Sequence, residues 1–136
     1  MKTLEAVGYI LKRVQHGLRA AMDAALRDLE VTSPQYAVLA FLEQSPGLSG
    51  AELARRAFVT PQTMHRIVAH LESAGLVSRE PHPEVGRRLD ATLTPAGRER
   101  LADCHRRVEA VEARLVAGLA TAEREQLVTL LERCQL

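Results

Sequence analysis

Apolar residues recur every three or four positions at both ends of this 136-residue chain. The first stripe occupies one side of a long helix and consists of Leu4, Val7, Leu11, Val14, Leu18, Ala21, Ala25 and Leu29. Near the other end two further stripes follow, first Leu101, Cys104, Val108, Val111 and Leu115, then Leu127, Leu130, Leu131 and Cys134. This spacing is typical of amphipathic helices. We therefore predict helices within about residues 3–30 and 95–135.

Between these ends, a hydroxyl residue stands before a proline at three places. Such a pair marks a helix start, because the hydroxyl caps a free backbone N–H and proline needs no N–H partner in the first turn. The pairs are Ser33-Pro34, Thr60-Pro61 and Thr94-Pro95. Ser49 followed by Glu52 predicts a fourth start with a capping box. Thr121 is the predicted cap of the last helix.

Between Gly75 and Thr94 the apolar residues recur at every second position instead of every third or fourth. Two short segments, 77–80 and 87–93, flank a turn that is rich in Pro and Gly. In the second segment Leu89, Ala91 and Leu93 alternate with polar residues, as they do in a half-buried strand. These features predict a β-hairpin with a polar tip.

The order of these elements predicts a fold class. A short helix over 50–57, a turn around Phe58 and Val59, and a helix over 60–74 make a helix-turn-helix, and the following hairpin makes it a winged helix. The predicted architecture is a single, mainly α domain over residues 1–136, with its winged helix-turn-helix core at about 33–98.

The two terminal helical regions carry more apolar surface than one small core covers. We expect helices within 3–30 and 95–135 to form a dimerisation region, since long apolar stripes are typical of helices that pack on one another. Folding back within one chain would also bury them. The pattern alone leaves both arrangements open.

The predicted helix over 60–74 has two different faces. Met64, Ile67, Val68 and Leu71 share the apolar side, and the opposite side is polar and free of carboxylates at its start. Gln and Arg are suited to base edges in the major groove, and Thr to a base or a phosphate. A solvated surface helix has the same pattern, but the adjoining short helix and hairpin favour DNA. We call the polar positions at the start of this helix the reading face, and they are Gln62, Thr63, His65 and Arg66.

The charge distribution adds a weak signal in the same direction. The net charge is +1, and residues 50–98 hold seven Lys and Arg against five Asp and Glu. Arg87 and Arg88 at the hairpin tip are suited to the negative potential of a minor groove. The four aromatic residues all precede position 60, so a platform for stacking single-stranded bases is not expected.

Several segments together resemble the MarR-type transcriptional regulators. They are "ELARR" at 52–56, "VTPQTMHRIVAHLESAGLVSRE" at 59–80 and "LTPAGRE" at 93–99. The resemblance implies a homodimeric repressor whose two recognition helices reach successive major grooves of a pseudo-palindromic operator. It assigns DNA contacts to the reading face, to Thr60 and to the wing residue Arg87. The family's wing usually has an aspartate two residues before that arginine, where this chain has Val85, and Glu84 and Asp90 are the candidates to take its place.

The resemblance also implies a small anionic or phenolic effector that releases the DNA. Its pocket in the family lies between the dimerisation helices and the DNA-binding lobe, and His16 and Tyr36 are the candidate lining residues here. The alternative function is a winged helix that has become a protein-interaction module. Salt distinguishes the two, because DNA binding weakens steeply with salt and an apolar protein interface barely responds.

Other chemistry finds little support in the chain. We expect no catalytic residues and no enzyme activity, because nucleophile elbows, phosphate-binding glycine loops and spaced carboxylate pairs do not occur. No cofactor or metal is expected, since the histidines are dispersed. Cys104 and Cys134 lie on apolar stripes and are interpreted as small hydrophobic residues rather than redox sensors. The absence of a signal peptide and of an apolar run of membrane-spanning length predicts a cytoplasmic protein.

Overall fold

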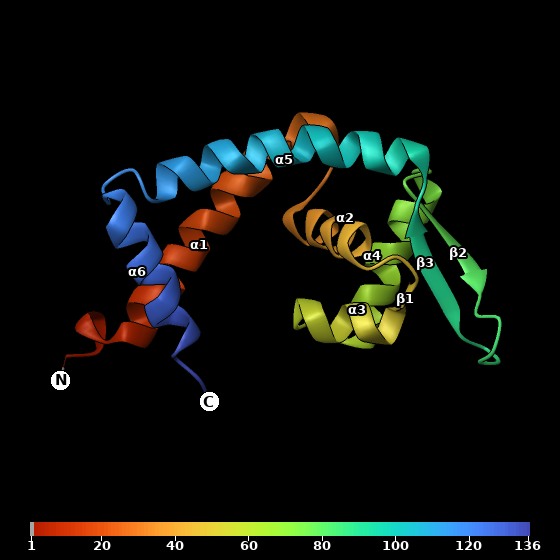
Figure 1. The fold of residues 1–136 in the computed structure, drawn as a ribbon, viewed down its shortest axis with the longest axis horizontal. Coiled ribbons are helices and arrows are strands. Elements are labelled where there is room, and N and C mark those ends of the chain that lie inside the picture. The colour runs from red at the N-terminus through yellow and green to blue at the C-terminus, as the bar shows by residue number, and fades with distance from the viewer. Residues whose placement is uncertain (1) are drawn as a thin grey trace.

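A computed structural model describes residues 2–136, and its architecture confirms the predicted winged helix (Figure 1). Helices dominate, and a small antiparallel sheet joins them. In chain order the elements are the 3₁₀ helix η1 (Thr3–Glu5), α1 (Val7–Leu26), the 3₁₀ helix η2 (Arg27–Leu29), α2 (Ser33–Gln44), β1 (Leu48–Ser49), α3 (Gly50–Ala57), α4 (Pro61–Ser73), β2 (Val77–Pro81), β3 (Leu89–Leu93), α5 (Pro95–Leu115) and α6 (Thr121–Glu132).

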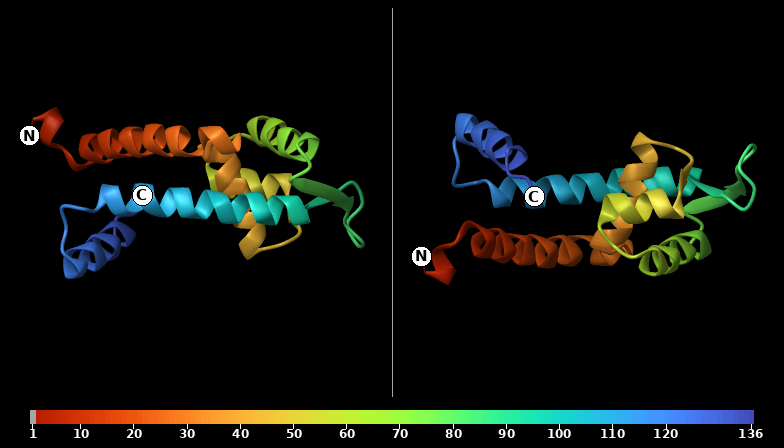
Figure 2. Two further views of the ribbon diagram at one scale, coloured as in Figure 1. Left: turned by 90° about the horizontal axis from the view of Figure 1, so that it is seen from above. Right: turned by 90° about the horizontal axis from the view of Figure 1, so that it is seen from below.

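Helix α5 runs along the length of the molecule and joins its two ends. At one end lie α2, α3, α4 and the sheet, and at the other lie α6 and the first turns of α1 (Figure 1). Helix α1 packs beside α5 and runs in the opposite direction, as the two views of Figure 2 show. The chain therefore folds into a compact lobe and a helical arm that share α5.

The hydrophobic core lies in the compact lobe. Its fully buried side chains come from α1 to α5 and from β2, and they include Leu39, Leu42, Leu53, Met64 and Leu101. Burying a side chain of this size stabilises a fold by about 1.5–3 kcal/mol. The apolar side of the predicted helix over 60–74 is confirmed, because Met64, Val68 and Leu71 are buried and Ile67 packs against them.

The sheet has one more strand than the sequence predicts. Strand order is β1-β3-β2, and all pairs are antiparallel. In the hairpin, Val77 is opposite Leu93 and Pro81 is opposite Leu89, so the paired segments end close to the predicted limits. Strand β1 pairs Leu48 with Ala91. It escapes prediction because two residues are too short to show a period of two.

The N-cap of α2 is Thr32, one residue before the predicted Ser33. The Thr32 hydroxyl accepts the backbone N–H of Gln35 at 3.3 Å, and the Gln35 side chain accepts the N–H of Thr32 at 3.0 Å. These two bonds form a capping box. Ser33 instead donates its backbone N–H and its hydroxyl to the Asp23 carboxylate on α1, at 2.8 and 2.7 Å. This residue therefore ties α2 to α1.

The other predicted hydroxyl caps are confirmed at Ser49, Thr60 and Thr94, and the predicted cap at Thr121 is wrong. The hydroxyls of Thr60 and Thr94 accept backbone N–H groups at the starts of α4 and α5. Thr121, in contrast, is already the first residue of α6. The preceding Ala120 has no capping side chain, and its backbone N–H donates to the Glu123 carboxylate at 2.8 Å.

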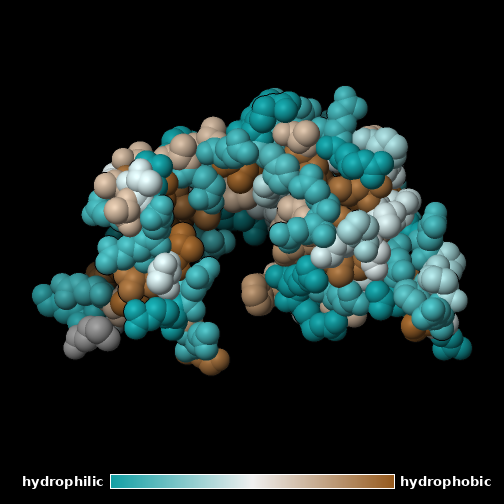
Figure 3. Space-filling model, viewed as in Figure 1, coloured by the Kyte–Doolittle hydropathy of each residue, from teal (hydrophilic) through white to brown (hydrophobic). Residues whose placement is uncertain are grey.

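The helical arm leaves an apolar surface uncovered. Leu4 and Val7 are 66% and 68% exposed, and every residue of α6 is exposed. Figure 3 shows apolar side chains along this end of the molecule, facing a hollow between the arm and the compact lobe. Folding back on α5 therefore buries only part of the apolar stripes. No helix within residues 2–136 is long and apolar enough to cross a membrane.

A glycine in α5 allows its close approach to the compact lobe, and we expect its replacement to destabilise the fold. A Cβ atom on Gly97 would lie 2.0 Å from the backbone carbonyl oxygen of Leu76. Gly97→Ala should therefore lower the free energy of unfolding by about 1–3 kcal/mol or more. Urea unfolding followed by circular dichroism measures this change. Gly118→Ala is the matched control, since its Cβ would meet no atom within 4 Å. Equal stability of both variants would contradict the close contact.

Candidate nucleic-acid interface

A short turn holds α3 and α4 in a fixed relation. Helix α3 ends at Ala57, and the next residue, Phe58, adopts a left-handed backbone conformation with φ of 57°. The backbone N–H of Val59 then donates to the carbonyl of Ala54 at 3.1 Å. Buried Leu53 on α3 and Met64 on α4 belong to the same core cluster. The turn and the core together fix the direction in which α4 presents its outer side.

The reading face lies on the exposed side of α4, as predicted. Gln62, Thr63, His65 and Arg66 are all exposed. The first carboxylate of the helix is that of Glu72, which accepts a hydrogen bond from Arg79 at 2.9 Å. This bond holds the pKa of Glu72 below its ordinary value. The start of α4 is therefore an accessible surface of hydrogen-bond donors and acceptors without negative charge.

Thr60, a candidate DNA contact, also has the structural role that the Thr60-Pro61 pair predicts. Its hydroxyl oxygen accepts the backbone N–H of Thr63 at 3.1 Å and donates to the Thr63 hydroxyl at 3.0 Å. These bonds satisfy a free donor at the helix start. Thr60 and Thr63 therefore form a unit that orders the N-terminal turn of α4.

The wing tip presents Arg87 to solvent. Arg87 is exposed and has a φ of 65°, a conformation that is unfavourable for residues other than glycine. Backbone strain from a positive φ is often found at functional sites. Two backbone N–H groups of the tip, those of Glu84 and Val85, donate to Nδ1 of His82 at 3.0 Å each. The tip is thus ordered by its own histidine.

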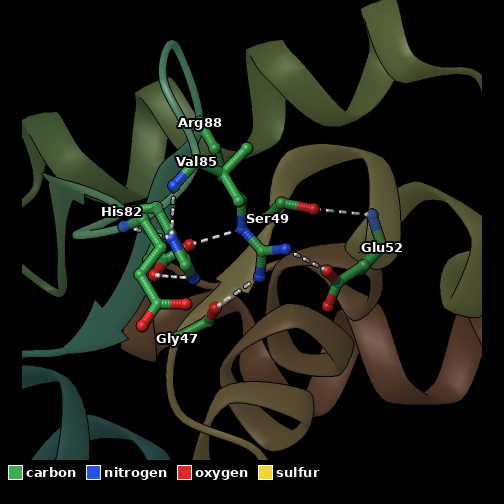
Figure 4. A network of polar contacts seen from close by, with 8 residues as sticks. Gly47, Ser49, Glu52, His82, Val85 and Arg88 are labelled. Atoms are coloured by element: carbon green, nitrogen blue, oxygen red, sulfur yellow. Dashed lines mark hydrogen bonds and ion pairs between the residues drawn. The ribbon is translucent and has the colours of Figure 1, made fainter.

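Arg88 was predicted to join Arg87 at the tip, but its guanidinium points toward the body of the wing (Figure 4). Nε donates to Asp90 at 2.7 Å, Nη1 lies 3.0 Å from the Glu52 carboxylate, and Nη2 donates to the Gly47 carbonyl at 3.3 Å. The bond to Asp90 holds the pKa of Arg88 above its ordinary value. We call Arg88, Asp90, Glu52 and Gly47 the wing network.

The wing network also corrects the predicted capping box of α3. The Ser49 hydroxyl accepts the N–H of Glu52 at 3.2 Å, as expected. The Glu52 carboxylate does not return this bond to Ser49, because it pairs with Arg88. Sequence spacing detects the local half of such a motif, but it misses a partner that lies on a distant strand.

A groove separates the reading face from the wing. It has a volume of about 420 Å³, and its lining includes His65 on α4 and Arg79 and Arg87 on the hairpin. The Nε of Arg79 is buried and lacks a hydrogen-bond partner within the described residues 2–136. The groove therefore lies between the two exposed elements, and Arg79 in its wall is paired with Glu72 at 2.9 Å.

The structure does not bring His16 and Tyr36 together in a pocket. His16 is exposed on α1. The Tyr36 hydroxyl lies 2.8 Å from Nδ1 of His105 on α5, whose Nε2 lies 2.9 Å from Glu43. Burial raises the pKa of Tyr36. This chain of hydrogen bonds links α2 to α5, which is a packing role.

A different cavity lies between α1 and the compact lobe. It has a volume of about 320 Å³, and we call it the inter-lobe cavity. Its walls come from α1, α2, the end of α3 and the turn that follows it, and include Leu18, Arg19, Met22, Phe41, Arg56 and Phe58. Phe58 is 94% exposed beside it. The sequence gives no local signal for this cavity because its walls are distant in the chain.

The cysteines differ from one another in their surroundings. Cys104 is buried in the core cluster, and burial raises the pKa of its thiol. Its predicted role as a small hydrophobic residue is confirmed. Cys134 is exposed, so the predicted packing of its side chain is not found in the single chain. Within residues 2–136, no three His, Cys, Asp or Glu side chains are grouped so that they could hold a metal ion.

The short helix α3, the turn, the exposed α4 and the wing define the chain as a winged helix-turn-helix protein. A sequence profile of the MarR family matches residues 29–88. The HTH-type transcriptional repressor Rv2887 of Mycobacterium tuberculosis is 43% identical over 127 residues, which are 93% of this chain and 91% of the relative. The chain therefore belongs to the MarR family.

Solved structures are similar over nearly the whole chain. Rv2887 in complex with DNA has a TM-score of 0.79 at 41% identity, covering 94% of this chain and 96% of that one. Rv2887 in complex with salicylic acid has a TM-score of 0.78 at 43% identity, covering 94% and 95%. A probable transcriptional regulator from Pseudomonas aeruginosa has a TM-score of 0.88 at 27% identity, covering 97% and 98%.

The capping role of Thr60 predicts a loss of stability that is independent of any ligand. Thr60→Ala removes the acceptor for the Thr63 N–H and should cost about 1 kcal/mol. Thr60→Ser keeps the hydroxyl and should restore most of that stability. Thermal unfolding of both variants measures the difference. If Thr60→Ser is as destabilised as Thr60→Ala, the methyl group and not the cap is responsible.

Proposed function

We propose that this chain is a homodimeric transcriptional repressor that binds a pseudo-palindromic DNA operator and is released by a small aromatic acid. The observation that carries the proposal is the exposed reading face, which is free of carboxylates and lies beside a wing tip that exposes Arg87. A helix of this kind fits the major groove, where Gln recognises adenine and Arg recognises guanine. The likeness to Rv2887, which has been solved with DNA, supports the same reading.

The uncovered apolar surface of the arm supports the dimer. Exposed apolar residues of η1, α1 and α6 lie at the same end of the molecule (Figure 1), and they include Leu4, Val7, Leu11, Val14, Leu127 and Leu131. A two-fold axis through this end would bury the same surface of both copies. The two α4 helices would then read half-sites about 10 base pairs apart, or a multiple of that distance.

The proposed contacts divide between the two grooves. Gln62 and Arg66 read base edges in the major groove, while Thr60, Thr63 and His65 bind the phosphate backbone or a neighbouring base. Arg87 enters the minor groove from the wing tip. Arg88 is omitted from this set of contacts because its guanidinium is held by Asp90 and Glu52.

The inter-lobe cavity is the proposed effector site. Apolar side chains such as Met22 and Phe41 suit an aromatic ring, and Arg19 and Arg56 supply positive charge for a carboxylate. The structure of Rv2887 with salicylic acid supports this chemical class. The cavity touches both α1 and the turn before α4. A ligand that binds one relative position of these elements more tightly would therefore change the spacing of the two reading faces.

The chain acts by binding and has no catalytic role, because its exposed polar groups are arranged along a helix and a wing rather than around a reaction site. It acts in the cytoplasm, where a repressor meets DNA. Two free thiols suit a reducing compartment.

Substitutions on the reading face should weaken operator binding without changing the dimer. Gln62→Ala and Arg66→Ala each remove a bidentate base contact, and each should cost about 1–3 kcal/mol of binding free energy. Fluorescence anisotropy with a duplex selected from a random library measures the affinity, and size-exclusion chromatography with light scattering checks the dimer. Wild-type affinity in both variants would show that α4 reads DNA with another face.

The salt dependence of the same titration tests the class of partner. Specific DNA binding should lose affinity steeply with salt, because each neutralised phosphate releases counterions. A flat response, or the absence of any selected duplex, would favour a protein-interaction module instead.

The effector proposal predicts a difference between two neighbouring arginines. Salicylate should release the DNA, and Arg56→Gln should raise the concentration needed for half release about tenfold, because a charged hydrogen bond to the carboxylate is lost. Arg55→Gln is the matched control, since Arg56 lines the inter-lobe cavity and Arg55 is not among its lining residues. Release titrations by anisotropy measure both. An equal shift in the two variants would place the effector elsewhere.

A further inference from the structure

The wing tip has few backbone bonds of its own. Strand pairing ends where Pro81 is opposite Leu89, so the segment from 82 to 88 lies beyond the sheet. Two backbone bonds cross this segment, from His82 to the carbonyl of Arg88 and from Arg88 to the carbonyl of Val85, at 2.8 and 3.3 Å. A two-stranded hairpin is only marginally stable without support from another element. The position of the tip therefore depends on contacts made by side chains.

Those contacts converge on Arg88. Its guanidinium binds the Asp90 carboxylate on β3, the Glu52 carboxylate on α3 and the Gly47 carbonyl just before β1 (Figure 4). The side chains of Arg88, Glu52 and Asp90 are 29%, 27% and 20% exposed, so all three ions are largely shielded from water. Shielding strengthens an ion pair relative to one on the open surface. The wing is thus tied to the helix-turn-helix by a charged contact between distant parts of the chain.

A second set of bonds continues the connection to the tip. Nδ1 of His82 accepts the backbone N–H groups of Glu84 and Val85, and its Nε2 lies 4.0 Å from the other oxygen of Asp90. The tip turn bonds to His82, the backbone N–H of His82 donates to the carbonyl of Arg88 at 2.8 Å, and Arg88 pairs with Glu52 on α3, so these contacts connect the tip to α3. Arg87 lies at the tip end of these contacts. Val85, which is 49% exposed, has no polar group with which to hold that arginine.

We propose that Arg88 is a positioning residue that ties the wing to α3 through Glu52 and so determines where Arg87 meets the DNA. This inference rests on the proposed function, because it assigns a role within DNA binding. Arg88 acts through Arg87 and does not itself touch the nucleic acid. Glu52, an acidic residue in a surface that binds an anion, contributes to affinity by holding Arg88.

Removing the charge of Glu52 tests the inference, because two explanations predict opposite changes in the affinity for DNA. Removing a carboxylate near DNA should strengthen binding if only long-range electrostatics matters. If Glu52 holds the wing, Glu52→Ala should weaken binding about fivefold. Glu84→Ala is the matched control, because Glu84 is an exposed wing carboxylate outside the network, and its loss should leave the affinity equal or slightly higher. Tighter binding by Glu52→Ala would overturn the inference.

A double-mutant comparison tests whether Arg88 acts through Arg87. Arg88→Ala should weaken operator binding about fivefold in the wild-type background and have little effect in an Arg87→Ala background. Equal losses in both backgrounds would mean that Arg88 contacts DNA directly, which contradicts the positioning role. Affinities come from anisotropy with the same selected duplex, and circular dichroism checks that each variant folds.

Hydrogen exchange of the free protein provides a readout that needs no DNA. Arg88→Ala and Glu52→Ala should both speed exchange of the Glu84 and Val85 amides, with the α4 amides unchanged. Unchanged exchange at the tip would overturn the anchoring. If the wild type binds a selected duplex and both variants bind it with the same affinity, the inference is rejected and the proposed function stands. Failure of the wild type to bind any selected duplex would reject both.

Discussion

The buried stripe of α5 is the contact on which the two ends of the molecule depend. Its first half, around Leu101 and Cys104, completes the core of the compact lobe, while further along the helix α1 packs beside it. Where the two meet, Arg107 binds the Asp28 carboxylate through two bonds, at 2.6 and 2.9 Å. Arg100 donates to the carbonyl of Leu29 at 2.6 Å. The lobe and the arm are therefore joined at η2 by packing and by charge.

The two proposed DNA-contacting elements are held by different forces. Helix α4 is fixed by burial of Met64, Val68 and Leu71, which leaves its polar side outward whatever the salt concentration. The wing is fixed by Arg88 and its acidic partners, and ion pairs of this kind weaken as salt rises. The reading face is thus the rigid element and the wing the adjustable one. In the proposed complex with DNA, the core-supported helix would read the sequence and the wing would add affinity.

The sequence predicted the elements whose signals are local, and it missed contacts between distant residues. The period of apolar residues located the helices, and hydroxyl residues before proline located the starts of α4 and α5. The reading face followed from the same period, since fixing one side of α4 in the core determines the other. Arg88 illustrates the limit, because its bond to Gly47 spans 41 positions and left no trace in local spacing. His16 and Tyr36 are not among the lining residues of the inter-lobe cavity for a related reason, since only tertiary packing decides which side chains line a cavity.

In the proposed dimer, helix α1 both lines the effector cavity and forms part of the dimer interface. Leu18 and Met22 line the inter-lobe cavity, while Val7, Leu11 and Val14 lie on the exposed apolar surface that a second copy would cover. A ligand between α1 and the compact lobe therefore acts on the same helix that sets the dimer geometry. Because α4 is held by a well-packed core, unfolding it would cost more free energy than moving the lobe as a unit. The lower-energy response is a rigid shift of the lobe relative to α1, which alters the spacing of the two reading faces. Release of DNA then follows from a mismatch with the half-site spacing, and each recognition helix stays intact.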